Sequence, residues 1–140
     1  MTTFQTQRQL PASPAAVFAA IQDPARLAKW WGPNGFTNVF EIFEFVPGGR
    51  WLFEMIGPDG TRYRNESAFA HIEQDRQVVV HHIAPPEFRL TITLEAVGDG
   101  TLLTWQQAFT DPAVAAALKA MVEPANEQNL DRLTAVLQAQ

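Results

Sequence analysis

The chain contains no cysteine. This absence excludes disulfides, thiol nucleophiles and metal sites built on thiolates, although it does not identify a compartment. Long apolar runs are missing too, since none approaches the ~20 residues that a helix needs to cross a bilayer. The N-terminus lacks the charged region and apolar run of a signal peptide. We therefore expect a cytoplasmic protein that does not insert into a membrane.

Positive charge is scarce. Ten Lys and Arg residues stand against fifteen Asp and Glu, giving a formal charge of −5, and no basic block occurs along the chain. Nucleic acids and anionic membranes attract clustered positive charge, so neither is expected as a partner. No phosphate-binding loop, dinucleotide fingerprint or Gly-x-Ser-x-Gly elbow occurs either. We expect no cofactor, and the sequence offers no recognisable catalytic motif.

The apolar content is sufficient for one core. The 140 residues are 46% hydrophobic and no linker or repeat divides them, which predicts a single domain over residues 1–140. Ser13-Pro14, Asp23-Pro24 and Asp111-Pro112 each place a capping side chain before a proline that suits the first helical position. These pairs predict helices that begin near residues 14, 24 and 112.

Between residues 36 and 109 the apolar pattern changes to alternation, interrupted by short turns rich in Gly, Pro and Asp. This pattern predicts about six strands in an antiparallel meander, with one more strand before the first helix. Residues 112–138 carry the apolar stripe of one long helix, in which Pro124 predicts a kink or a restart. The fold class is therefore α+β, with a curved antiparallel sheet wrapped around the long C-terminal helix.

Five stretches carry a family resemblance. They are "PASPAAVFAAIQDPARLAKWWGPNGFT" at 11–37, "F-x-F-x-PGG-R-W" at 43–51, "M-x-GPDG" at 55–60, "H-x-x-x-P-x-F" at 82–88 and "PANEQNLDRL" at 124–133. They resemble the START-like (SRPBCC, Bet v 1-like) superfamily and, within it, homologues of the activator of the heat-shock protein 90 ATPase. The resemblance implies a helix-grip fold with an apolar cavity between sheet and long helix. It implies no single activity, because members bind lipids, sterols and polyketides, and some cyclise or hydroxylate.

Strand parity nominates the side chains that face this cavity, unless they simply fill a solid core. We expect an apolar or amphipathic small molecule as the ligand. Its apolar body would contact Trp51, Phe53, Met55, Trp105 and Met121, its polar end would meet His82, Tyr63 or Asn129, and Trp31 would lie at the rim.

His82 is the main polar candidate, because its strand phase agrees with Val78 and Val80. An inward imidazole could orient a ligand or act as acid and base, and the alternative is a structural histidine bonded to backbone near Pro85. Because His81 and His82 are adjacent in a strand, they point to opposite sides, so no metal site is expected. Asn126 and Asn129 could face the cavity mouth or only solvate the helix.

The stretch "LAKWWGPNGF" at 27–36 joins the second short helix to the meander. Adjacent helical residues point about 100° apart, so the two tryptophans cannot share one environment. Trp30 follows Leu27 by three positions and is predicted to plug the core, which leaves Trp31 for the rim or for a partner.

Two other classes of function stay open at this stage. One is a cyclase-like or hydrolase-like enzyme acting on a ketide-type substrate, which needs His82 or another cavity group within ~3 Å of the reacting atom. The other is a co-chaperone-like interaction module, which needs an exposed apolar patch of more than a few hundred Å². A homodimer could form through a sheet edge or through the two-tryptophan region.

Overall fold

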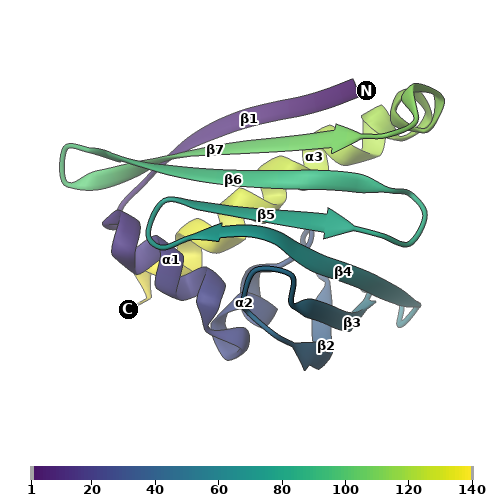
Figure 1. Cartoon of the computed structure of the whole chain (residues 1–140), viewed down its shortest axis with the longest axis horizontal. Helices are drawn as coiled ribbons and strands as arrows, with labels where there is room; N and C mark the ends of the chain where they lie inside the picture. Colours follow the sequence, from purple (N-terminus) through teal and green to yellow (C-terminus); the bar gives the residue numbers. More distant parts are fainter. Residues whose placement is uncertain (1, 140) are drawn as a thin grey trace.

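A computed structural model describes residues 2–139 of the protein (Figure 1). The elements in chain order are β1 (Thr2–Leu10), α1 (Pro14–Gln22), α2 (Pro24–Trp30), β2 (Thr37–Phe43), β3 (Arg50–Ile56), β4 (Arg62–Glu73), β5 (Gln77–His82), β6 (Phe88–Val97), β7 (Gly100–Phe109) and α3 (Pro112–Gln138).

The seven strands form one antiparallel sheet in the order β1-β7-β6-β5-β4-β3-β2. Strands β2 to β7 make the predicted meander, and β1 closes the far edge by pairing with β7. The long helix α3 runs diagonally across one face of the curved sheet (Figure 1). The predicted α+β class with a sheet wrapped around a C-terminal helix is confirmed.

The three predicted helix starts are also confirmed. Helices α1, α2 and α3 begin at Pro14, Pro24 and Pro112, each with proline at the first position. Each preceding side chain caps its helix by accepting a backbone N–H of the first turn, as in the 3.2 Å bond from Ala16 N to Ser13 Oγ. The local sequence therefore determines where each helix begins.

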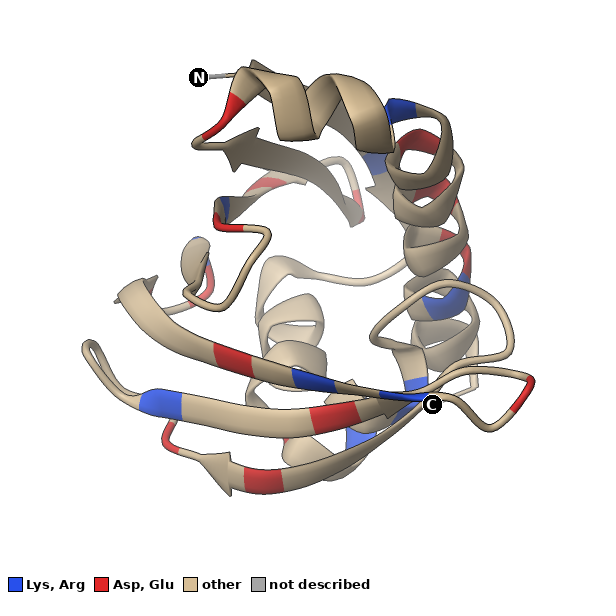
Figure 2. Cartoon of the chain, turned by 90° about the vertical axis from the view of Figure 1, so that its right-hand side faces the viewer, with Lys and Arg blue, Asp and Glu red and all other residues tan. Residues whose placement is uncertain are grey.

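Helix α3 continues through Pro124 without the restart that we considered. Its first turns nevertheless run in a different direction from the rest of the helix, which Figure 2 shows most plainly. Proline removes one backbone hydrogen bond and clashes with the carbonyl four residues earlier, so the bend belongs near Pro124. The bend lets α3 follow the curvature of the sheet.

The inward parity predicted for Tyr63 in β4 holds because the irregularity of that strand comes after it, beyond Phe69. Register shifts occur between Phe40 and Ile42 in β2 and between Phe69 and His71 in β4. Each shift changes which side chains point inward beyond it. The main core consists of buried residues from α1, α2, α3 and the concave face of the sheet.

Candidate functional site

The segment after α2, residues 31–36, is fastened to α3 by an arginine that the sequence analysis did not single out. Both terminal nitrogens of Arg132 donate to backbone carbonyls of the segment 29–36. The acceptors are the carbonyl oxygens of Lys29 (2.7 Å), Trp31 (3.1 Å), Gly32 (3.0 Å), Pro33 (2.9 Å) and Phe36 (2.9 Å). Burial lowers the pKa of the half-buried Arg132 guanidinium. Its planar set of donors matches this cluster of oxygens, which no lysine could reproduce.

Asn129, one turn before Arg132, holds the same segment from the interior. Its amide Nδ2 donates to the carbonyl of Trp30 at 2.7 Å, and its Oδ1 accepts from the backbone N–H of Gly32 at 3.2 Å. Asn129 is buried and lies beside the cavity described below. Its amide is therefore bonded to backbone and positions the wall of the cavity.

The two tryptophans occupy different environments. Trp30 is 0% exposed, and its indole Nε1 donates to the carbonyl of Ala20 at 3.0 Å. Trp31 is half-buried, with its ring centroid 5.0 Å from that of Trp51 and 5.9 Å from that of Trp105. Trp30 is thus the predicted core plug, and Trp31 covers the cavity from the side of the 31–36 segment.

A cavity of about 670 Å³ lies between the concave face of the sheet and the first half of α3. Most of its wall is apolar. The side chains that we expected at a ligand and that line it are Trp31, Phe53, Met55, Tyr63, His82, Trp105, Met121 and Asn129; further lining residues include Ser67, Val80, Phe88, Leu90, Gln107, Phe109, Leu118, Val122, Ala125 and Asn126.

The prediction that Trp51 contacts the ligand is wrong, because Trp51 does not line this cavity. Its inward direction was predicted correctly, since it is 1% exposed, but its ring is enclosed by Trp31, Phe53 and Phe69. The indole therefore supports the cavity wall from behind. Strand parity reports the face of a sheet, not the position along the face at which the core becomes hollow.

The cavity opens towards solvent between β4 and α3. Tyr63 is 49% exposed and Met121 is 63% exposed, although both also line the cavity. Large apolar side chains with this exposure are costly in water unless something covers them. These two residues mark the mouth, whereas Phe53, Leu90 and Trp105 mark the buried interior.

His82 faces the interior, as its strand phase predicted, and its ring stacks on Phe88 with 4.6 Å between centroids. Nδ1 lies 2.9 Å from the carbonyl oxygen of Pro86, which can only accept, so Nδ1 carries a proton. Nε2 lies 2.8 Å from Oδ1 of Asn65. That contact becomes a hydrogen bond when Nε2 is protonated too, or when the Asn65 amide turns over.

Burial is the main cause that lowers the pKa of His82, and the carbonyl of Pro86 opposes it. An imidazole whose pKa is lower in the folded than in the unfolded protein takes up its proton more readily on unfolding. We expect the free energy of unfolding to fall as pH drops below about 6.5, by about 1.4 kcal/mol for each unit of difference between the two pKa values. Urea unfolding between pH 7.5 and 5 measures this slope.

The variant His82→Gln is the control for that slope, because it keeps a hydrogen-bonding side chain and removes the titration. The other two histidines, His71 and His81, stay in both proteins, so a difference between the two slopes comes from His82. Equal slopes for the two proteins between pH 7.5 and 5 would show that His82 titrates normally in the folded state.

The two amides near the mouth also differ in their roles. Asn126 Nδ2 donates to Gln107 Oε1 at 3.1 Å, so an α3 side chain joins a β7 side chain across the cavity wall. Both residues line the cavity. The alternative that Asn126 only solvates the helix is therefore wrong.

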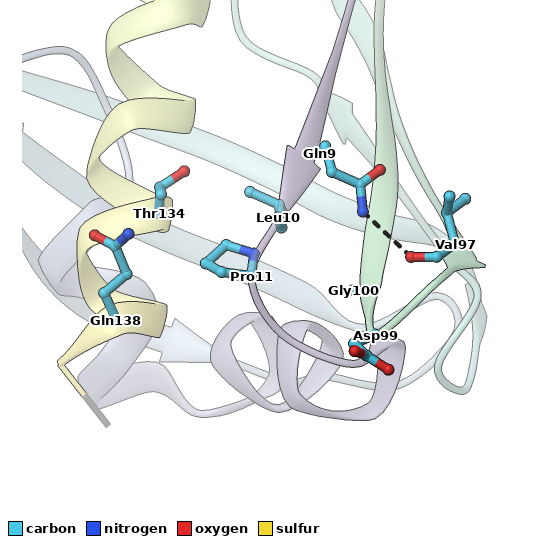
Figure 3. A pocket seen from close by; sticks show the side chains of 8 residues that line it. All are labelled: Gln9, Leu10, Pro11, Val97, Asp99, Gly100, Thr134 and Gln138. Carbon is cyan, nitrogen blue, oxygen red and sulfur yellow. Dashed lines mark hydrogen bonds between the residues drawn. The ribbon is translucent and has the colours of Figure 1, made fainter.

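A second hollow, of about 560 Å³, lies at the C-terminal end of β1, between the β6–β7 hairpin and the last turns of α3 (Figure 3). Its side chains are spread around the hollow and do not converge on a point. Two of its polar groups already bond backbone, since Gln9 Nε2 donates to Val97 O and Thr134 Oγ1 to Leu130 O. The polar side chains of this hollow therefore do not form a site that could bind a ligand through several hydrogen bonds.

Residues of both charge signs occur on the strands and on α3, as the colours of the ribbon in Figure 2 show. Within residues 2–139, no group of three His, Asp or Glu residues comes close enough to hold a metal ion. No helix in the same range is long and apolar enough to span a bilayer.

A curved antiparallel sheet that grips one long helix over a half-open apolar cavity defines a helix-grip protein of the START-like class. Residues 11–138 match the family described as "Activator of Hsp90 ATPase homolog 1-like protein". The chain belongs to this family, as the motifs at 11–37 and 124–133 indicated. A comparison with curated proteins finds no match.

Solved structures share the fold at low identity. A protein from Arthrobacter aurescens is 26% identical, with a TM-score of 0.90 over 99% of this chain and 87% of that one. A protein from Nitrosomonas europaea is 18% identical, with a TM-score of 0.90 over 98% and 94%. The AHSA1 protein from Silicibacter pomeroyi is 21% identical, with a TM-score of 0.79 over 99% of both chains.

Proposed function

We propose that the chain binds an apolar or amphipathic small molecule in the cavity between the sheet and α3. The observation that carries this proposal is a cavity of about 670 Å³ with aromatic walls, polar groups at few points and one open side. Small-molecule sites typically have this size and composition. The fold family is also one of ligand-binding domains in general.

The energy of binding would come from apolar burial. A ligand that buries ~200 Å² of apolar surface gains about 5 kcal/mol at 25 cal/mol per Å², before the cost of ordering it is subtracted. The exposed side chains of Tyr63 and Met121 would close over the entrance and add to this area. A gain of about 5 kcal/mol corresponds to a dissociation constant of about 0.2 mM, so a ligand must bury ~330 Å² of apolar surface or more to reach micromolar affinity.

The enzyme alternative receives less support from the geometry of His82. An acid–base catalyst needs a ring nitrogen within hydrogen-bond reach of the substrate. Here Nδ1 bonds the carbonyl of Pro86 and Nε2 faces the Asn65 amide. Nδ1 is thus bonded to backbone and Nε2 lies against a side-chain amide, which favours a structural role for the only inward histidine among residues 2–139.

The interaction-module alternative depended on an exposed patch at the two tryptophans. Trp30 is enclosed and Trp31 packs on two other indoles, so neither forms a protruding apolar surface. The large exposed apolar side chains come from separate elements, and the pair near the cavity mouth, Tyr63 and Met121, serves a small molecule equally well. The homodimer stays a prediction.

The test combines native mass spectrometry of the freshly purified protein with a titration of the denatured and refolded protein. We expect an adduct of a few hundred daltons in the first measurement. In the second, 2-ethylnaphthalene should change the fluorescence of Trp31 and Trp105, which both line the cavity. A fully ligand-free mass together with unchanged fluorescence at the solubility limit of the probe would reject the proposal.

A further inference from the structure

Two residues that line the cavity carry a buried polar atom without a hydrogen-bond partner. Within residues 2–139, five buried side-chain nitrogen or oxygen atoms lack a hydrogen-bond partner. Two of them, Ser67 Oγ and Trp105 Nε1, belong to residues that line the cavity and are 1% and 2% exposed. A third, Trp51 Nε1, lies on the strand next to Ser67, at the directly paired position.

An unpartnered buried polar group costs free energy, so each such group in a folded protein needs an explanation. The indole N–H of Trp105 can only donate, and the hydroxyl of Ser67 can donate or accept. An oxygen acceptor on a ligand can therefore complement either group. An ammonium group, which can only donate, could not satisfy Trp105.

The charged residues near the cavity also favour a ligand without net charge. None of the residues that line the cavity is Asp or Glu. The two lining arginines are exposed and paired outside, Arg62 with Glu54 and Arg64 with Glu41. A buried cation would therefore have no counter-charge, and a buried carboxylate would have none in the interior either.

We propose that the cavity selects a neutral molecule that has an apolar body and at least one carbonyl or ether oxygen, which accepts a hydrogen bond from Trp105 Nε1 or Ser67 Oγ. This inference rests on the proposed function, because it needs a cavity that takes up ligands. It adds a polar selection rule, namely an oxygen acceptor without net charge, and it names the two side chains that apply the rule.

Three naphthalene probes of equal skeleton test the rule: 2-acetylnaphthalene with a ketone oxygen, 2-ethylnaphthalene without one, and protonated 1-(2-naphthyl)ethylamine with a positive charge. Isothermal titration at pH 7 gives the dissociation constant of each probe for the parent protein and for three variants. Trp105→Phe and Ser67→Ala each remove one donor. Trp51→Phe is the matched control, because it removes an indole N–H from a residue that does not line the cavity.

We expect the ketone to lose about three- to tenfold in affinity in Trp105→Phe or in Ser67→Ala, the range that one hydrogen bond accounts for. The hydrocarbon should change less than about twofold in the same variants, and Trp51→Phe should affect both probes equally. The ammonium probe should bind the parent protein more weakly than the ketone.

The failures are distinguishable. If the hydrocarbon binds and the ketone responds to the three variants as the hydrocarbon does, the selection rule is wrong and the proposed function stands. If the ammonium probe binds as tightly as the ketone, the charge part of the rule is wrong. If none of the probes binds, the proposed function itself fails and the rule falls with it. Circular dichroism and melting curves establish that each variant is folded.

Discussion

Replacing Arg132 with methionine is expected to lower the free energy of unfolding by about 3 kcal/mol. The substitution keeps an unbranched apolar stem and removes the guanidinium that donates to five backbone carbonyls between Lys29 and Phe36. Hydrogen bonds to charged groups contribute about 1.5–3 kcal/mol each, and partial access of water to this half-buried site keeps the total well below their sum. Urea unfolding followed by circular dichroism measures the loss.

Arg8→Met is the matched control for that experiment. Arg8 also fastens α3 to another element, but through ion pairs with Glu127 at 3.1 Å and Asp131 at 2.8 Å whose acidic partners are exposed. Exposed pairs of this kind contribute about 0–1 kcal/mol. Similar losses in the two variants would mean that the carbonyl cluster around Arg132 has no special weight. Arg132→Lys should recover only a minor part of the stability, because one ammonium cannot reach all five oxygens.

The adjacent tryptophans are expected to respond oppositely to truncation. Trp30→Ala should cost about 3–5 kcal/mol of stability, because a fully enclosed indole leaves a large void in the core. Trp31→Ala should cost roughly half as much, since its site adjoins an open cavity that water can fill, and it should weaken binding of 2-ethylnaphthalene about tenfold or more. Thermal melts and fluorescence titration measure the two effects.

Trp30→Phe keeps this comparison usable if the alanine variant does not fold, because phenylalanine retains one ring and loses the bond to Ala20. It should be destabilised while its affinity for 2-ethylnaphthalene stays within about twofold of the parent value once folded protein is counted. A loss of affinity in Trp30→Phe equal to that in Trp31→Ala would contradict the division into plug and wall.

Local signals in the sequence were sufficient to predict where the helices begin and which side chains of the strands point inward. Ser13, Asp23 and Asp111 each stand before a proline, and all three pairs start a helix because capping and proline geometry act within one turn. Strand parity placed His82 and Trp105 inward for a similar reason, since successive side chains alternate whatever the partner strand is.

Contacts between distant segments were beyond that reasoning. Arg132 lies about a hundred positions from the carbonyls that it binds, and nothing near it in the sequence names backbone oxygens as its partners. The available signal was its spacing of three residues from Asn129, which places both side chains on the same side of a helix. In the structure this side of α3 meets the 31–36 segment. Trp51 shows the same limit, because the curvature of the whole sheet decides where solid core gives way to cavity.

The central claim is that the space between sheet and α3 takes up a small molecule, and intermolecular nuclear Overhauser effects test it most directly. In protein with labelled methyl groups, bound 2-ethylnaphthalene should give cross-peaks to Met55, Val80 and Leu90, which line the cavity on three different strands. Cross-peaks confined to Leu10 and Val97 in the second hollow, or none under saturating probe, would contradict the account.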